Sequence, residues 1–188
     1  MKEIDEPGVN LSTKARDTTA GFIVEKATGE KLSDYVSRKL WTPMHAEESA
    51  LWSLDRKDGM EKAYCCFNSN ARDFARFGQL LLNNGQWDDR QLISPAYLAE
   101  ATSPDTRLVY KDLGKPNHCY GFQYWILDYK GMKIPYMRGI LGQYVFTLPE
   151  KNAVIVRLGH KRSDTYTADQ HYPDDINTWL DAAMDLLQ

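Results

Sequence analysis

The clearest periodic pattern in the chain follows Asn68 and Ser69. Apolar residues recur there at three- and four-residue spacing, which forms one stripe of a helix: Ala71, Phe74, Ala75, Gly78, Leu81 and Leu82. Four polar residues face away from that stripe: Arg72, Asp73, Arg76 and Gln79. Asn83-Asn84-Gly85 ends the pattern, because Asn and Gly favour the turn after a helix. The spacing predicts an amphipathic helix with Asp73 on its outer face.

Two weaker helices are predicted before it. Residues 1–16 are polar and contain Pro7-Gly8, which is typical of an irregular lead-in. The run 18–27 has a helical composition, and Gly29 supplies the left-handed stop. Ser33 is placed to cap a second helix, which Pro43 ends.

Two more helices are predicted later in the chain. Ser94-Pro95 is an N-cap followed by proline at the first helical position, so we expect a helix from Pro95 to about Ala101. The last helix opens at Pro173, with Asp174 and Asp175 where negative charge suits the N-terminal dipole. Its apolar stripe consists of Ile176, Trp179, Leu180, Ala183, Met184 and Leu187.

Strand patterns dominate after Cys119. Four runs rich in β-branched and aromatic residues are separated by Gly and Pro: 120–127, 133–137, 143–148 and 153–158. Short connections of this kind favour an antiparallel meander. A separate apolar run, 63–67, suits a buried strand or extended segment. Helices, then strands, then one helix predict an α+β fold with flanking helices on an antiparallel sheet.

Composition narrows the function classes. The 188 residues suit one domain, and 43% hydrophobic with 26% charged residues is typical of a packed globular fold. The net charge of -3, with both signs scattered, excludes the basic face that binds nucleic acid. The apolar stretches are too short to span a bilayer. The first six residues are acidic where a signal peptide is basic, so the cytoplasm is the default compartment.

The metal-ligating residue types are sparse. Cys65, Cys66 and Cys119 have no metal spacing, and adjacent cysteines rarely pair, so we read all three as buried free thiols in preference to a disulfide. The histidines sit in four separate segments without an i, i+4 pair: His45, His118, His160 and His171. We therefore expect no metal site and no cofactor.

Two segments together carry a resemblance to a known family. Residues 67–87 are similar to a helix with the pattern "ARDLARFGQLLLNGG.W", and residues 138–144, followed by Pro149-Glu150-Lys151, resemble a last active-site strand and the hairpin after it. The family that these segments resemble is the penicillin-recognising serine hydrolases, the superfamily of class C-like β-lactamases and esterases. The likeness covers roughly residues 17–187 and is nearest to the nylon-oligomer hydrolase branch. It implies a partial β-lactamase/transpeptidase-like fold.

That family hydrolyses amide, ester or β-lactam bonds through a serine nucleophile. A serine hydroxyl is a poor nucleophile at neutral pH, so a lysine one helical turn away must handle its proton, which gives the motif Ser-x-x-Lys. No serine in this chain is followed three positions on by lysine. Ser53 and Ser69 are followed by Arg56 and Arg72, and arginine stays protonated. The chain alone is predicted to be inactive.

Two further family motifs align with this sequence. The Tyr-x-Ser or Tyr-x-Asn position, counted from Pro7-Gly8, falls on Thr13, Lys14 and Ala15, so the tyrosine is missing. The Lys-Thr-Gly position aligns with residues 138–140. The resemblance implies that five residues bind substrate there: Arg138, Gly139, Ile140, Gly142 and Gln143. Glycine suits a strand that approaches a substrate closely.

Three of the aligned positions have alternative interpretations. Arg138 either holds a substrate carboxylate or is an ordinary strand arginine. Gln143 either orients the strand or satisfies a partly buried position. Lys14 either supplies a cation or is a solvated lysine.

Two hypotheses of function follow. In the first, residues 1–188 are the C-terminal part of one serine hydrolase domain, and the Ser-x-x-Lys half lies upstream. In the second, the chain is a non-catalytic scaffold that binds a partner. An absent upstream half would leave strand faces and one side of the 71–82 helix uncovered, so we expect a homodimer, a tightly associated missing half, or poor solubility. Members of the family are often exported, which leaves the compartment of an intact protein open.

Overall fold

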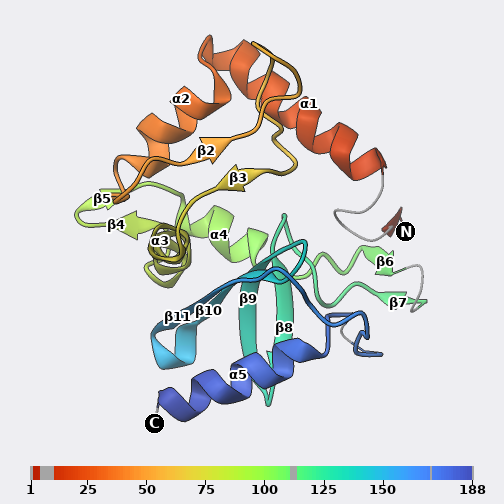
Figure 1. Cartoon of the computed structure of the whole chain (residues 1–188). Coiled ribbons are helices and arrows are strands. Elements are labelled where there is room, and N and C mark those ends of the chain that lie inside the picture. The colour runs from red at the N-terminus through yellow and green to blue at the C-terminus, as the bar shows by residue number, and fades with distance from the viewer. Residues whose placement is uncertain (1, 5–10, 111–113, 170, 188) are drawn as a thin grey trace.

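The computed structural model describes residues 2–4, 11–110, 114–169 and 171–187. A four-stranded sheet lies between two helices, one on each face (Figure 1). The helices are α3 (Ala71–Leu82) and α5 (Asp175–Leu186). The strands are β8 (Trp125–Tyr129), β9 (Met132–Gly139), β10 (Gln143–Leu148) and β11 (Ala153–Leu158). The predicted α+β class is confirmed.

The four strands run as an antiparallel meander in the order β11-β10-β9-β8. The last two strands match their predicted bounds. The first begins at Trp125, five residues later than expected, because Gln123 adopts a left-handed conformation with φ of 64°. Tyr120 therefore contributes only an isolated bridge to Trp125.

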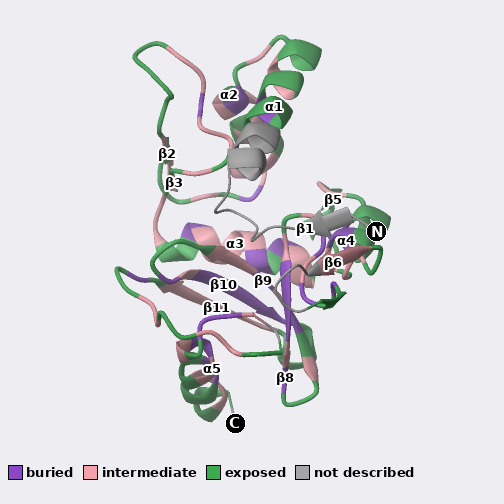
Figure 2. Cartoon of the chain, turned by 90° about the vertical axis from the view of Figure 1, so that its right-hand side faces the viewer, coloured by how far each residue is buried: buried purple, intermediate pink, exposed green. Residues whose placement is uncertain are grey.

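The sheet has a different kind of packing on each face. On the α5 face, aromatic residues of three strands pack against Ile176 and Leu180 of α5, and both of these aliphatic side chains are fully buried. On the other face, Gly78 lets α3 approach closely, since a Cβ at this position would lie 2.5 Å from a methyl group of Val154. Figure 2 shows the buried strands between these two helices. Most of the chain's buried apolar residues belong to this sheet region.

Asp73 corrects the prediction for α3. The helical spacing put it on the outer face, but its side chain is fully buried. Its carboxylate accepts hydrogen bonds from the backbone amides of Glu47, at 2.8 Å, and Glu48, at 3.1 Å. The loop that carries these amides covers what would otherwise be the solvent face of α3. Asn70 caps the helix by accepting from the Asp73 amide at 2.9 Å.

The amino-terminal helices differ from the prediction at their starts. The helix α1 spans Leu11–Thr28, so residues 11–16 are helical and not an irregular lead-in. Gly29 ends it with φ of 71°, as predicted. A short strand, β1 (Lys2–Ile4), pairs in parallel with β6 (Leu108–Tyr110). The predicted irregular segment at Pro7-Gly8 lies outside the described residues.

The second helix is shorter than expected and has a different cap. The helix α2 spans Leu32–Val36 and continues as a π-helical turn over Ser37–Trp41. Lys31 occupies the N-cap position without a capping side chain, so the predicted cap at Ser33 is wrong. The Ser33 amide instead donates to the buried carboxylate of Glu61 at 3.3 Å.

The run 63–67 also corrects the prediction. Only Phe67 belongs to a strand, β3 (Phe67–Asn68), which pairs with β2 (Leu51–Trp52). Residues 63–65 form a turn and a bend, because the Trp52 indole donates to the carbonyls of Lys62 and Cys65, each at 3.0 Å. Within this turn Cys65 and Cys66 form a disulfide. The reading of three buried free thiols is therefore wrong for these two, whereas Cys119 is a buried thiol outside any disulfide.

The remaining elements are short. The helix α4 (Pro95–Ala101) has the predicted bounds, and the Ser94 hydroxyl accepts from the Tyr97 amide. The other strands are β4 (Gln86–Trp87), β5 (Arg90–Gln91) and β7 (Lys115–Pro116), and a 3-10 turn covers Pro149–Lys151. Among the described residues, no helix has the length and apolar character needed to cross a membrane.

The expected uncovered apolar surface is not where the sequence placed it. No large apolar residue of α3 is exposed, and along β8–β11 only Leu158, at 44%, is. The other exposed large apolar residues lie on α1, on the segment before α3, on α4, on the turn after β9 and on the outer side and end of α5. The homodimer stays a prediction, but uncovered strand faces no longer support it.

Candidate substrate-binding turn

The predicted substrate-binding residues all lie at one end of the sheet. Arg138 and Gly139 end β9, Gln143 opens β10, and the connection between them contains Ile140 and Gly142. We call residues 138–143 the β9–β10 turn. Gly139 faces Gln143 across the strand pair, so both ends of the turn belong to one ladder. The structure thus brings together the five residues that the sequence singled out.

The strand β9 is open on one side where it enters this turn. The ladder between β8 and β9 ends at the pair Trp125 and Tyr136, whereas β9 continues along β10 as far as Gly139. Within the described part of the chain, no strand pairs with 137–139 on the side away from β10. An unpaired strand edge presents backbone donors and acceptors to any extended group that lies against it.

Arg157 of β11 fixes the shape of the turn. Its guanidinium donates to the carbonyl oxygens of Gly142 and Lys161, each at 2.7 Å. Gly142 has φ of 83°, and a Cβ there would lie 1.7 Å from the Arg157 Nη1. Glycine is therefore required at this position both by the backbone and by the packed guanidinium. The Gln143 side chain donates to the carbonyl of Gly159, which ties the start of β10 to the segment after β11.

Arg138 is packed on aromatic rings. Its guanidinium carbon lies 3.3 Å from the ring centroid of Trp125 and 5.9 Å from that of Tyr166. One of its nitrogens donates to the carbonyl of His171 at 2.9 Å. A cation stacked on tryptophan in this way is held in a defined position. These contacts support the packing alternative, and a substrate role for Arg138 stays a prediction.

Two buried tyrosines are neighbours of Arg138 in the sheet: Tyr144 is its partner on β10, and Tyr136 lies two residues earlier on β9. Burial raises the pKa of Tyr136, and the neighbouring Arg138 guanidinium only partly offsets this effect. Burial likewise raises the pKa of Tyr144, together with the Asp175 carboxylate, against the opposing influence of Arg162, Arg157 and Arg138. Both phenols stay protonated at neutral pH, because each pKa lies above its ordinary value of about 10. Neither is therefore a proton acceptor at neutral pH.

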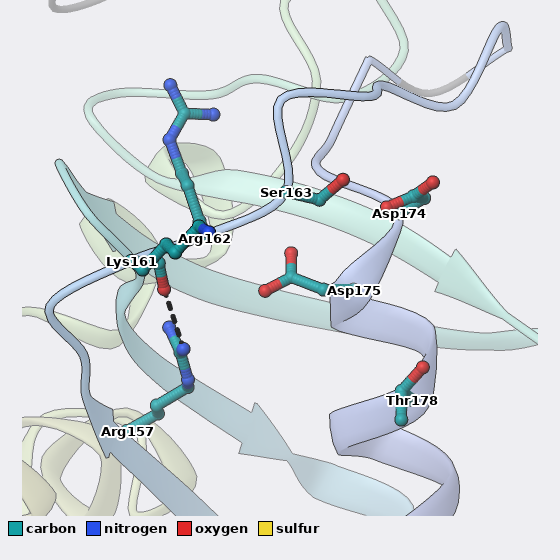
Figure 3. A pocket seen from close by; sticks show the side chains of 7 residues that line it. All are labelled: Arg157, Lys161, Arg162, Ser163, Asp174, Asp175 and Thr178. Atoms are coloured by element: carbon teal, nitrogen blue, oxygen red, sulfur yellow. Dashed lines mark hydrogen bonds between the residues drawn. The ribbon is translucent and has the colours of Figure 1, made fainter.

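A pocket of about 620 Å³ lies between Arg157, the segment 161–163 and the start of α5 (Figure 3). Its walls carry both signs of charge: Arg157, Lys161, Arg162, Ser163, Asp174, Asp175 and Thr178. Figure 3 shows the Asp175 carboxylate directed toward the segment that carries Lys161 and Ser163. None of the five predicted residues lines this pocket. It adjoins the β9–β10 turn through Arg157 and through the Lys161 carbonyl, which lies close to Gly142.

The other predicted positions lie elsewhere. Thr13, Lys14 and Ala15 fall in the first turns of α1, so their backbone is helical and not the loop expected for Lys14. His45 contacts the exposed carboxylate of Asp88 at 2.9 Å. Among the described residues, no three His, Cys, Asp or Glu side chains gather as metal ligands would.

Sequence reasoning missed two residues that shape the turn. Trp125 and Arg157 come from β8 and β11, so neither is near the turn in sequence. Arg157 did carry a signal, because it is the single charged residue in the apolar strand 153–158. A charge in such a strand indicates a partner, which here is the carbonyl of Gly142.

An antiparallel sheet between two helices, with a glycine-containing turn at the open end of one strand, defines the class of this chain as an α+β protein of the β-lactamase fold. The Beta-lactamase family model matches residues 6–175, and the chain therefore belongs to the Beta-lactamase family. The resemblance seen in the sequence is confirmed.

Individual relatives agree with this assignment. A 6-aminohexanoate-dimer hydrolase of Paenarthrobacter ureafaciens is 26% identical over 148 residues, which are 77% of this chain and 37% of the relative. A solved structure described as a 6-aminohexanoate-dimer hydrolase from Bacillus anthracis has a TM-score of 0.71 and 26% identity, and the match covers 90% of this chain and 41% of that one.

A β-lactamase structure from Mycobacterium bovis has a TM-score of 0.64 at 18% identity, with 93% of this chain and 63% of that chain covered. That likeness concerns the fold alone. The chain spans less than half the length of the two hydrolase relatives.

Proposed function

We propose that residues 1–188 are the C-terminal part of a single serine hydrolase domain that acts on amide, ester or β-lactam bonds through an acyl-enzyme. The nucleophile half, with its Ser-x-x-Lys, is supplied from outside this chain. The family membership and the absence of any Ser-x-x-Lys in the sequence support the proposal. The observation that carries it is the open edge of β9 at 137–139, beside a turn that Arg157 holds in place.

The β9–β10 turn binds the substrate in this proposal. The open edge of β9 hydrogen-bonds the substrate amide or ester as a neighbouring strand would. Gly139, which is exposed, lets the substrate approach the backbone, and Ile140 offers an apolar contact because it is 78% exposed. Arg138 and Gln143 hold the two strand ends, and Arg138 contacts a substrate carboxylate through N–H groups other than the one that donates to the His171 carbonyl.

A penicillin-derived fluorescent probe tests this proposal. The purified chain alone is expected to form no covalent adduct, because it has no serine beside a neutral amine. Co-expression with the polypeptide encoded immediately upstream is expected to give an adduct on the upstream serine. Labelling of the 188-residue chain by itself would contradict the proposed division of the domain.

A matched pair of variants tests the turn within the complemented protein. Ile140→Asp places a charge where the substrate is proposed to lie and is expected to slow acylation about tenfold or more, which corresponds to about 1.4 kcal/mol. Leu186→Asp changes an equally exposed apolar residue, 86% accessible, near the far end of α5. Equal acylation rates for the two variants would remove the β9–β10 turn from the proposed site.

A second function is favoured by one observation. The family's Tyr-x-Ser position is occupied by Thr13, Lys14 and Ala15, and these residues lie in the helix α1. A non-catalytic scaffold that binds a partner has no need of that tyrosine. An upstream reading frame without Ser-x-x-Lys, or a complemented protein that is never acylated, would support this function over the hydrolase.

A further inference from the structure

A disulfide joins two neighbouring residues just before β3. Cys65 and Cys66 are bonded to each other, Cys65 is half-buried, and Cys66 is exposed. Nothing in the β9–β10 turn involves them. An exposed disulfide is open to attack by a thiolate, and disulfides of this kind are the labile ones. The bond is therefore placed for chemistry with molecules from solution.

A purely structural role explains this bond poorly. A disulfide stabilises a fold mainly by closing a loop in the unfolded chain, and the effect grows with the length of that loop. The sequence separation here is one residue, so the bond closes the shortest loop that two cysteines can form. It removes little freedom from the unfolded chain beyond that single peptide unit. Any effect of the bond must therefore be local.

Locally, the bond lies within a turn in which the carbonyls of both cysteines accept hydrogen bonds. The Cys65 carbonyl accepts from the Trp52 indole at 3.0 Å, and the Cys66 carbonyl accepts from the Ser53 amide at 3.1 Å. Cys66 has φ of 69°, a conformation that residues with a Cβ rarely adopt. The ring formed by the two bonded cysteines helps to hold this conformation. Breaking the bond frees the Cys66 backbone to leave the left-handed region.

Aromatic contacts connect the turn to α3. The Trp52 ring lies 5.3 Å from Phe67, whose ring is also 5.3 Å from Trp41 and 6.1 Å from Phe74 of α3. Each pair meets edge to face, which depends on ring orientation. A shift of the Trp52 indole away from Cys65 therefore changes the surroundings of two tryptophans.

We propose that Cys65 and Cys66 form a thiol–disulfide exchange site that takes a dithiol reductant, and that its reduction loosens the contact between Trp52 and the turn. The reductant's thiolate attacks the Cys66 sulfur, which is in the more exposed residue. A bond forms between these two sulfurs, the Cys65–Cys66 bond breaks, and the electron pair leaves on the Cys65 sulfur, which takes up a proton. The second thiolate of the reductant then attacks the reductant sulfur that is bonded to Cys66. This step forms the reductant's internal disulfide and releases the Cys66 thiolate, which is also protonated. The protein gains two electrons and two protons, and the reductant becomes a disulfide.

Alkylation of the folded protein tests the site. Without reductant, iodoacetamide is expected to modify neither Cys65 nor Cys66. After treatment with dithiothreitol under native conditions, two alkyl groups are expected, both on this pair, while the buried Cys119 stays unmodified. Modification of Cys65 and Cys66 without reductant would show that no disulfide is present. Modification that occurs only together with Cys119 would show that reduction needs unfolding, and it would overturn the proposal.

Indole N–H resonances test the structural consequence. Reduction is expected to shift the Trp52 signal, and re-oxidation with oxidised glutathione to restore it, while the Trp125 and Trp179 signals stay in place. The double variant Cys65→Ala/Cys66→Gly is expected to fold, because glycine accepts the left-handed conformation of residue 66, and to show no response to dithiothreitol. Cys119→Ser is the matched control and is expected to respond as the unchanged chain does. A Trp52 signal that is the same in both redox states would contradict the proposal.

Discussion

The sheet region and the amino-terminal region are stabilised in different ways. The sheet region, β8–β11 with α3 and α5, contains a continuous cluster of buried aromatic and aliphatic side chains. In the amino-terminal region, residues 18–70, the buried apolar residues are Leu32 and Met44. Two buried carboxylates, Glu61 and Asp73 of the adjoining α3, hold this region by accepting backbone hydrogen bonds.

The difference follows from the kind of contact that each type of element can make when it is buried. Strands alternate their side chains, so a meander covered by helices on both faces buries apolar residues from every strand. After α1, the amino-terminal region consists of short elements joined by turns, and the backbone of these turns has no partner in a helix or strand. Buried backbone donors need acceptors, and the carboxylates supply them. A hydrophobic change should therefore damage the first region most, and loss of a carboxylate the second.

The largest effect is expected from Phe146→Ala. The Phe146 ring is fully buried in β10, 5.2 Å from Tyr136 and 5.4 Å from Tyr144. Removing a buried ring leaves a cavity and costs about 3–5 kcal/mol of unfolding free energy. Phe22→Ala is the matched control in α1, where the side chain is 46% exposed, and should cost about 0.5 kcal/mol or less. Urea denaturation followed by circular dichroism measures both, and equal midpoints would refute the assignment of the core.

A smaller effect is expected from Asp73→Asn. The carboxylate accepts from the Glu47 and Glu48 amides and from Asn70, at 2.7 Å, and it lies 3.3 Å from an Arg76 nitrogen. An amide side chain supplies one acceptor oxygen in place of two and removes one of the two carboxylates that pair with Arg76, the other being Glu47. We expect a loss of about 1.5–3 kcal/mol.

Hydrogen exchange localises the effect of Asp73→Asn. The amides of Glu47 and Glu48 should exchange faster, while those of β10 keep their relative protection. Asp34→Asn changes an exposed carboxylate of α2 and should leave all of these rates unchanged. Uniform acceleration across β10 as well would show that the two regions unfold as one unit.

Acid should separate the two regions. Burial raises the pKa of Asp73, but the Glu47 and Glu48 amides, Asn70 and Arg76 outweigh burial and hold that pKa below its ordinary value. The pKa of Glu61 is lowered in the same sense, since its hydrogen bonds with Ser33 outweigh burial. The unfolded chain thus binds more protons in acid, and this stabilisation is present above about pH 4 and lost as pH falls through the folded-state pKa values.

The carboxylates of the sheet region respond differently to acid. Asp128 and Asp181 also have lowered pKa values, because they pair with Lys133 and Lys130. Asp181 is exposed and Asp128 is only half-buried, so these pairs contribute little to stability. The indole resonances of Trp41 and Trp52 should therefore lose their folded positions at a higher pH than those of Trp125 and Trp179. Simultaneous loss of all four would contradict the comparison.

Sequence patterns were sufficient where local residues decide the structure. The Ser94-Pro95 pair fixed the start of α4, and alternation with Gly and Pro punctuation gave the bounds of β10 and β11. The residues of the β9–β10 turn were located because the resemblance aligns the family's Lys-Thr-Gly position with residues 138–140. In each case the controlling residues lie within a few positions of the feature.

Sequence patterns failed where distant residues decide. Asp73 was assigned to solvent because helical periodicity cannot show that the loop at Glu47 and Glu48 covers that face. The turn at Cys65 depends on a hydrogen bond that the indole N–H of Trp52, in β2, donates to the Cys65 carbonyl. Arg157 determines the turn at Gly142 from fifteen positions away. Contacts between segments leave no period in the sequence.

The smallest effect distinguishes two glycines of the sheet region. Gly142 and Gly131 both have positive φ, 83° and 86°, so alanine costs about 1 kcal/mol of backbone strain at either. At Gly131, which lies between β8 and β9, an added Cβ meets nothing within 4 Å, whereas at Gly142 it collides with the Arg157 guanidinium. Gly142→Ala should therefore be less stable than Gly131→Ala by about 1 kcal/mol, the lower end of overpacking costs. Thermal denaturation of the two variants measures this difference. If the two melt together, Arg157 moves aside without cost, and the β9–β10 turn is then held by its own backbone and not by a contact from β11.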